Sequence, residues 1–208
     1  MEKFLNSQSD SAEGGGVALD YNKVLVSGDS AGGYMALMSG LTQPKGKIKA
    51  ILAQYPMTKY LRHEPGPTFF GMPSPPESVL AEHLKTMAPG TVVSSAVPPA
   101  RMELSYALAT YGHYLTYFGK EEKMWPIGLV GEKTWLPPTW IIHGDADSAV
   151  DVEDSRAFVD KCKGLEEGVE VKFTVREGME HGFDGAMKED EEPWLKEGLA
   201  WIEGKWLS

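Results

Sequence analysis

The sequence predicts an α/β fold in which a mostly parallel sheet carries helices on both faces. Short apolar runs of strand length alternate with longer runs that fit helices, and this alternation is typical of parallel sheets. A chain of 208 residues can bury a sizeable core, and we expect one domain with an insertion. A glycine-rich segment, residues 28–33, stands at the first junction between a strand and a helix.

Four short runs of mainly apolar residues are predicted strands. They cover residues 24–27, 48–55, 139–143 and 169–176. Pro56 ends the second run, because proline cannot continue the hydrogen-bonding of a central strand, and Pro137 and Pro138 introduce the third. The fourth run alternates, with four apolar residues expected to face inward: Val169, Val171, Phe173 and Val175.

Three segments are predicted helices. They cover residues 31–40, residues 152–163 and the C-terminal stretch from about residue 193. Small residues near the start of the first helix allow it to approach the sheet closely. The second helix is amphipathic, with one apolar face made by Val152, Phe158, Val159 and Cys162. The third carries an apolar stripe, and acidic residues 189–192 suit its positive N-terminal end. That stripe consists of Leu195, Leu199, Ile202 and Trp206.

Residues 57–136 interrupt the alternation and are interpreted as a cap inserted after a strand end. They hold most of the prolines and a dense set of aromatic residues, and residues 101–118 could form one or two helices. Aromatic residues at helical spacing are more often core than pocket lining. A separate domain over residues 57–136 is the alternative, but we expect a single domain over residues 1–208, with its core at about 17–56 and 137–208.

Composition excludes several classes of function. The formal net charge of −10 argues against binding to nucleic acid or to an anionic membrane surface. The single cysteine, Cys162, excludes an intramolecular disulfide and suits a reducing compartment, so we expect a cytoplasmic protein. No apolar run is long enough to cross a bilayer, and no signal peptide is recognised. Neither a metal-ligand cluster nor a phosphate-binding loop is found, so no cofactor is expected.

The glycine-rich segment fits the nucleophile-elbow pattern Gly-x-Ser-x-Gly. It consists of Gly28, Asp29, Ser30, Ala31, Gly32 and Gly33. Such an elbow forces its serine into a strained backbone conformation that exposes the hydroxyl group. We expect Gly28 and Gly32 to crowd together, so that a side chain on either would clash. A glycine-rich turn with a capping serine is the alternative, but pattern and context both favour Ser30 as a nucleophile.

A serine nucleophile needs a base and an acid that orients the base. Asp145 and Asp147 both follow the third strand, at the edge where open parallel sheets place their chemistry, and strand geometry does not separate them. Both could instead cap the helix near Asp151. His181 follows the last strand and completes the chain order Ser, Asp, His. His143 is expected to end its strand structurally.

Three motifs resemble the α/β-hydrolase fold, specifically the hormone-sensitive-lipase-like esterases. They are the elbow at 28–33, the run His-Gly-x-x-Asp that ends at Asp147, and His181-Gly182-Phe183. The resemblance implies that Ser30 attacks an ester carbonyl, that His181 transfers the proton and that Asp147 orients the imidazole. It also implies that Ala31 contributes a backbone N–H group to the oxyanion hole. The aromatic cap favours an apolar ester, although an amide, lactone or thioester would use the same triad.

The chain departs from this family at its N-terminus. The family's His-Gly-Gly-Gly loop is missing, and Gly14-Gly15-Gly16 does not replace it, since no histidine precedes it and too few residues follow before Lys23. The sheet is therefore expected to lack its N-terminal strands. Residues 24–27 would then form an open edge through which a second copy could pair. There are two alternatives to an active esterase. The chain could be a folded binding module with weak or no activity, or it could be a piece of a longer enzyme.

Overall fold

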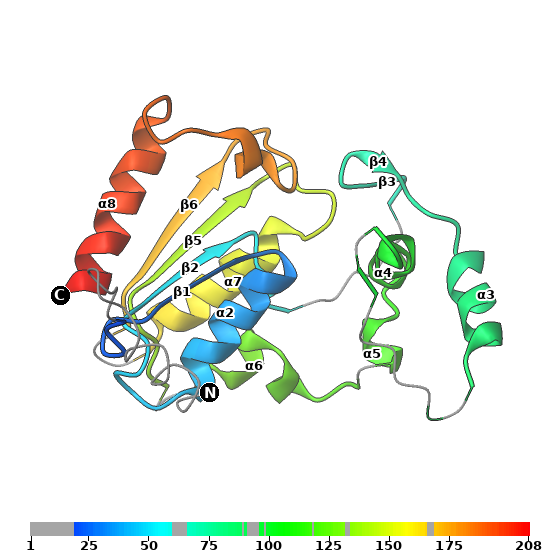
Figure 1. The fold of residues 1–208 in the computed structure, drawn as a ribbon, viewed down its shortest axis with the longest axis horizontal. Coiled ribbons are helices and arrows are strands. Elements are labelled where there is room, and N and C mark those ends of the chain that lie inside the picture. The colour runs from blue at the N-terminus through cyan, green and yellow to red at the C-terminus, as the bar shows by residue number, and fades with distance from the viewer. Residues whose placement is uncertain are drawn as a thin grey trace, which may run out of the picture.

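The computed structural model describes residues 19–59, 66–88, 90, 96–97, 99–117, 119–131, 134–165 and 169–208. Its main sheet has four parallel strands in the order β1-β2-β5-β6 (Figure 1). These are β1 (Leu25–Asp29), β2 (Ala50–Gln54), β5 (Thr139–Gly144) and β6 (Val171–Arg176). The four predicted strands are confirmed, with ends that differ from the prediction by at most two residues. The carboxyl ends of all four lie along the same edge, where parallel sheets commonly bind ligands.

Helices cover both faces of this sheet, as predicted. One face packs against α2 (Ala31–Thr42) and α7 (Val152–Lys163), and the other against α8 (Pro193–Leu207) (Figure 1). The inner strand β5 is buried along its whole length and alternates its side chains between the two layers. Ile141 packs among the residues of α2 and α7, whereas Trp140 and Ile142 join the cluster with Ile202 of α8. The apolar alternation of the sequence thus fixes which face each helix covers.

Cys162 belongs to the first of these layers. Its side chain is buried on α7, and burial raises the pKa of its thiol to about 12. A thiol held neutral in this way is a poor nucleophile, as expected for a core cysteine.

Residues 57–136 form short elements, none of which joins the main sheet in the ranges that the structure describes. The hairpin and helices α3 to α5 lie on the side of the sheet away from α8 (Figure 1). In chain order the elements are β3 (Thr68–Phe69), β4 (Met72–Pro73), α3 (Ser78–Thr86), α4 (Met102–Thr110), α5 (Tyr114–Tyr117), η1 (Glu122–Met124) and α6 (Pro126–Leu129). Phe69 and Ala109 pack against Ala149 and Val150 of the β5–α7 loop, so this region contacts the carboxyl-end edge of the sheet.

Some predictions concern the N-terminal part of the chain, which lies outside the described residues, or the open edge of β1. Gly14-Gly15-Gly16 and the expected start of the core at residue 17 lie outside the described residues. Within them, β1 pairs with β2 alone, and its use as an edge for a second copy stays a prediction. No helix in the described part of the chain is long and apolar enough to span a membrane.

The contact between α8 and the sheet gives a test of the packing. A Cβ atom on Gly198 would overlap the ring of Trp140, which is completely buried, whereas one on Gly204 of the same helix would meet open space. We expect Gly198→Ala to destabilise the fold by about 1–3 kcal/mol through overpacking. Gly204→Ala should be neutral or stabilise it by up to about 1 kcal/mol through helix propensity. Thermal unfolding followed by circular dichroism measures both, at roughly 2–4 °C per kcal/mol for a chain of this size. Equal melting temperatures would contradict the close packing.

Candidate active site

Ser30 stands between the end of β1 and the first residue of α2. Its backbone has φ 52° and ψ −116°, a conformation that non-glycine residues rarely adopt. The backbone N–H of Ser30 donates to the carbonyl of Gln54 on β2 at 2.9 Å, which ties the turn to the neighbouring strand. Strained residues of this kind concentrate at functional sites.

The two outer glycines of the elbow differ in how much space they have. A Cβ atom on Gly28 would overlap the backbone of Gly32, as predicted. The prediction for Gly32 itself was wrong, because a Cβ atom there would meet only Asp29 Oδ1, at an ordinary contact distance of 3.6 Å. At Gly33 a Cβ atom would come within 2.9 Å of Pro56. The tight approach therefore requires glycine at positions 28 and 33 and not at 32.

An apolar hollow of about 290 Å³ adjoins the elbow at Ala31. Its other lining residues are Tyr34, Met35, Met57, Tyr114, Met124 and Trp125. Tyr34 donates its hydroxyl hydrogen to the carbonyl of Met124 at 2.9 Å, so α2 is fixed to the segment that closes the hollow. As the first residue of α2, Ala31 has a backbone N–H group without an acceptor inside the helix.

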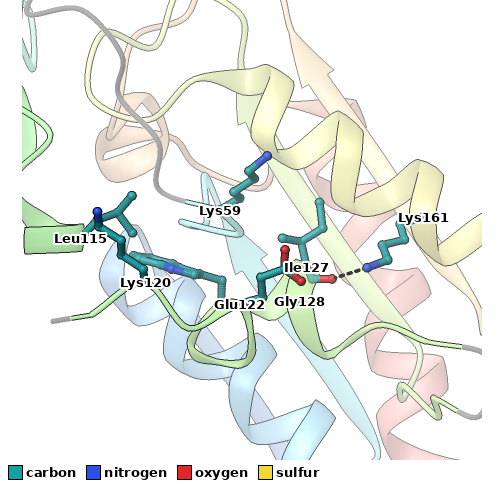
Figure 2. A pocket seen from close by; sticks show the side chains of 8 residues that line it. Lys59, Leu115, Lys120, Glu122, Ile127, Gly128 and Lys161 are labelled. Atoms are coloured by element: carbon teal, nitrogen blue, oxygen red, sulfur yellow. Dashed lines mark hydrogen bonds between the residues drawn. The ribbon is translucent and has the colours of Figure 1, made fainter.

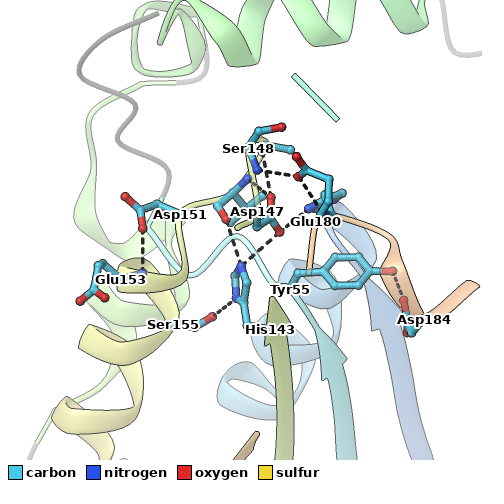
Figure 3. Close-up of polar contacts among 12 residues, drawn as sticks. Tyr55, His143, Asp147, Ser148, Asp151, Glu153, Ser155, Glu180 and Asp184 are labelled. Carbon is cyan, nitrogen blue, oxygen red and sulfur yellow. Dashed lines mark hydrogen bonds and ion pairs between the residues drawn. The ribbon is translucent and has the colours of Figure 1, made fainter. Parts of the chain in front are cut away.

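His181 and Asp147 are brought together by the loops that follow β6 and β5. His181 Nδ1 lies 2.6 Å from Asp147 Oδ2, and the two side chains are 1% and 0% exposed. The other carboxylate oxygen, Oδ1, accepts the backbone N–H groups of Ala149 and Val150, each at 2.8 Å. Figure 3 labels Asp147, with His143 and Glu180 beside it. These bonds fix the direction in which the carboxylate meets the imidazole.

The network also determines where the imidazole proton lies. Because Nδ1 of His181 faces a carboxylate oxygen, Nδ1 carries the proton and Nε2 keeps its lone pair. Nε2 is buried and has no hydrogen-bond partner among the described residues, so the structure does not join it to the hydroxyl of Ser30. A free lone pair on a buried imidazole nitrogen is suited to accept a proton.

Asp147 is charged despite its burial. Burial by itself raises the pKa of this carboxyl group, but hydrogen bonds from His143 and His181 and the charge of His181 outweigh it and lower the pKa to about 2. His143 Nε2 lies 3.3 Å from Asp147 Oδ2 and 3.0 Å from the carbonyl of Val150, while its Nδ1 lies 2.9 Å from Ser155 Oγ. His143, expected only to end its strand, therefore also supports the carboxylate (Figure 3).

The structure separates the two acids that strand geometry left open. Asp145 Oδ1 accepts the backbone N–H of Gly178 at 2.6 Å and has a structural place between two loops. Neither acid caps α7, because the N-cap is Asp151, whose side chain accepts the N–H of Glu153 at 2.9 Å. Only Asp147 makes the bond to His181.

Three residues at this site were not foreseen from the sequence. Glu180 Oε1 accepts the N–H groups of Ser148 and His181, at 2.6 and 2.7 Å, and so joins the two loops. The rings of Tyr55 and Phe70 contact the imidazole of His181, with centroids 4.4 and 4.6 Å away. Tyr55 follows the end of β2, the same position that marked the other candidates, whereas the sequence carries no signal for Phe70.

A second, wider hollow of about 420 Å³ shares Trp125 with the first. Three lysines and one acid line it: Lys59, Lys120, Lys161 and Glu122 (Figure 2). Lys161 donates to the carbonyl of Ile127 at 2.8 Å, so its ammonium group is partly satisfied by the protein itself. Within the described ranges, no group of His, Cys, Asp or Glu side chains is arranged to hold a metal ion.

Comparison with known proteins agrees with the motifs. A probable carboxylesterase, M8, of Phoma sp. (strain ATCC 20986 / MF5453) is 29% identical over 199 residues, which cover 90% of this chain and 61% of the relative. A probable carboxylesterase, clz11, of Cochliobolus lunatus is 29% identical over 141 residues, which cover 63% of this chain and 64% of the relative. The chain thus spans less than two thirds of the length of these curated relatives.

Among solved structures, esterase 2 of Thermogutta terrifontis phosphonylated by sarin aligns with a TM-score of 0.49 at 19% identity, over 88% of this chain and 55% of that one. Its butyrate-bound form aligns with a TM-score of 0.48 at 20% identity. A family model described as the alpha/beta hydrolase fold matches residues 4–185. This match covers well over half of the 208-residue chain, so the chain belongs to the α/β-hydrolase fold family, as the three motifs predicted.

Proposed function

We propose that this chain supplies the catalytic residues of a serine hydrolase that cleaves carboxylic esters, with Ser30 as nucleophile, His181 as base and Asp147 as the orienting acid. The observation that carries the proposal is the buried imidazole of His181. Its Nδ1 is held by an ionised carboxylate and its Nε2 is free, which is the state that a general base requires. The names of both curated relatives, probable carboxylesterases, support the same reaction class.

In the proposed reaction Ser30 Oγ attacks the ester carbonyl carbon while its proton passes to Nε2 of His181. The resulting imidazolium is stabilised by Asp147, which remains charged. Collapse of the tetrahedral intermediate breaks the bond to the alcohol oxygen, and His181 returns the proton to that oxygen. Water then attacks the acyl-enzyme with the same base, releasing the carboxylic acid and restoring Ser30.

The developing oxyanion needs hydrogen-bond donors, and the backbone N–H of Ala31 is the proposed one. It lies next to the nucleophile at the start of α2, where the helix also contributes a positive partial charge. A single donor of this kind contributes about 10²–10³ in turnover.

The lining of the hollow beside Ala31 favours an apolar substrate group. Methionine and aromatic side chains dominate that lining, and a volume of about 290 Å³ suits a short acyl or alcohol chain. An ester with a short unbranched acyl chain is therefore the first substrate to test.

Removal of the nucleophile tests the proposal directly. We expect purified protein to hydrolyse p-nitrophenyl butyrate, and Ser30→Ala to lower kcat by at least about 10³-fold. Ser39→Ala, on the same helix, removes a hydroxyl that bonds only to the Met35 carbonyl in the structure and should change kcat by less than twofold. If folded wild-type protein hydrolyses the ester no faster than Ser30→Ala does, the esterase proposal fails and a non-catalytic binding module is favoured.

The two acids can be distinguished by activity. We expect Asp147→Asn to lower kcat by about 10³–10⁴-fold, because an amide facing His181 Nδ1 would favour the wrong imidazole tautomer. Asp145→Asn is the matched control and should retain most activity, since that side chain bonds to Gly178 instead. Steady-state kinetics on p-nitrophenyl butyrate measure both, and a larger loss from Asp145→Asn would reverse the assignment.

The charge of Asp147 also predicts a pH dependence of stability. Its pKa falls from an ordinary 3.8 to about 2 on folding, so its contribution is nearly complete above about pH 5 and is lost as the pH falls towards 2. The difference in unfolding free energy between wild type and Asp147→Asn should narrow by about 1 kcal/mol from pH 6 to pH 3. Urea unfolding at the two pH values measures this difference. If this difference in unfolding free energy stays constant or widens, the charged form of Asp147 does not stabilise the fold.

A further inference from the structure

Two residues with a strained backbone contact the imidazole of His181. Four non-glycine residues in the described ranges have a positive φ: Ser30, Tyr55, Phe70 and Arg101. Tyr55 and Phe70 contact the ring of His181, and Ser30 is the proposed nucleophile. Strain of this kind persists only where the surrounding structure enforces it, and it marks candidate functional positions.

Tyr55 is held from several directions. Its φ is 36°, its N–H donates to the Ile142 carbonyl at 2.6 Å, and the residue is only 4% exposed. Its hydroxyl donates to Asp184 Oδ1 at 2.8 Å (Figure 3). The other oxygen of Asp184 accepts from Gln54 Nε2 at 2.6 Å. Burial, and then Asp184, raise the pKa of the Tyr55 phenol, so it remains a neutral donor. The tyrosine ring is thus fixed at both ends against His181.

Phe70 contacts His181 from the inserted region, residues 57–136, whereas Tyr55 contacts it from the end of β2 in the main sheet. It lies with Gly71 in the turn of the β3–β4 hairpin, at φ 57°, and its ring packs against Phe69 and Tyr106. The N–H of Gly71 donates to Ser148 Oγ at 3.1 Å, so the turn is attached to the loop that carries Asp147. The hairpin therefore carries an aromatic ring from the inserted region to the proposed base.

We propose that Tyr55 and Phe70 are positioning residues that fix the plane of the His181 imidazole, an inference that rests on the proposed role of His181 as base. The hydrogen bond to Asp147 fixes Nδ1 but permits the ring to turn about the line through that bond, which would swing Nε2 away from the nucleophile. The rings of Tyr55 and Phe70 meet the imidazole at 54° and 87° and block this rotation. Asp184 acts one step further out, by holding Tyr55.

The test uses the whole 208-residue chain with ¹³C-labelled histidine, in which ring relaxation reports the motion of His181 independently of activity. His181→Gln assigns the signal. We expect the wild-type ring to be as ordered as rigid backbone, for which the order parameter is roughly 0.85, and to fall below the value of about 0.6 that marks flexible segments in Tyr55→Leu and in Phe70→Leu. Tyr55→Phe, which loses only the bond to Asp184, should lie between these values. Tyr111→Phe is the matched control, because its hydroxyl bonds to the Pro75 carbonyl and its ring has no contact with His181.

Kinetics on p-nitrophenyl butyrate provide the second measurement. We expect kcat to fall on the order of 10-fold to 10²-fold in Tyr55→Leu, with KM within twofold of wild type because Tyr55 does not line the apolar hollow. A rigid His181 ring and unchanged kcat in Phe70→Leu and Tyr55→Phe would overturn the inference, even if Tyr55→Leu fails to fold. If the His181 ring loosens in Tyr55→Leu and Phe70→Leu but the wild-type protein does not hydrolyse esters, the positioning role stands and the proposed function is rejected.

Discussion

The parallel pairing of β5 with β6 is the constraint on which the site depends. This register places His143 opposite Val175 and Gly144 opposite Arg176, so the loops that follow leave the sheet side by side. A Cβ atom on Gly144 would overlap the Met179 carbonyl, which explains why glycine follows histidine in that motif. The same carbonyl accepts the N–H of Ala146 at 3.1 Å, and the bond between Asp147 and His181 follows directly.

Burying a carboxylate next to an imidazole is unfavourable unless its oxygen atoms are satisfied. Asp147 meets this condition with two backbone N–H groups on one oxygen and two imidazoles on the other. The hydrogen bonds that keep the carboxylate charged also leave His181 with one free nitrogen. The same hydrogen bonds thus satisfy the buried carboxylate of Asp147 and leave His181 ready to act as the proposed base. The inserted region completes it, because Phe70 covers the imidazole from outside the sheet.

Much of this was accessible to sequence reasoning because the signals are local. Strand and helix periods located the four main strands and the helices α2, α7 and α8 to within about two residues, and each candidate among Ser30, Asp147 and His181 lies in the segment that follows a strand. The space available at Gly32 was misjudged, since the motif shows that a turn is tight but not which way each Cα hydrogen points. The choice between Asp145 and Asp147 stayed open on strand geometry, because both follow the same strand.

The sequence by itself determined the layered α/β architecture and the strand ends that carry the candidate residues, because apolar period and turn residues act over a few positions. The family resemblance already implied Asp147 as the acid, and the tertiary structure shows its contact with the imidazole. Only the tertiary structure decided that Tyr55 is held by Asp184 and that Phe70 reaches the same ring. The residues of the bond between Asp147 and His181 are 34 positions apart in the sequence, and those of the bond between Tyr55 and Asp184 are 129 positions apart. No local pattern encodes such distances, since they depend on strand order and on how the inserted region folds back over the sheet edge.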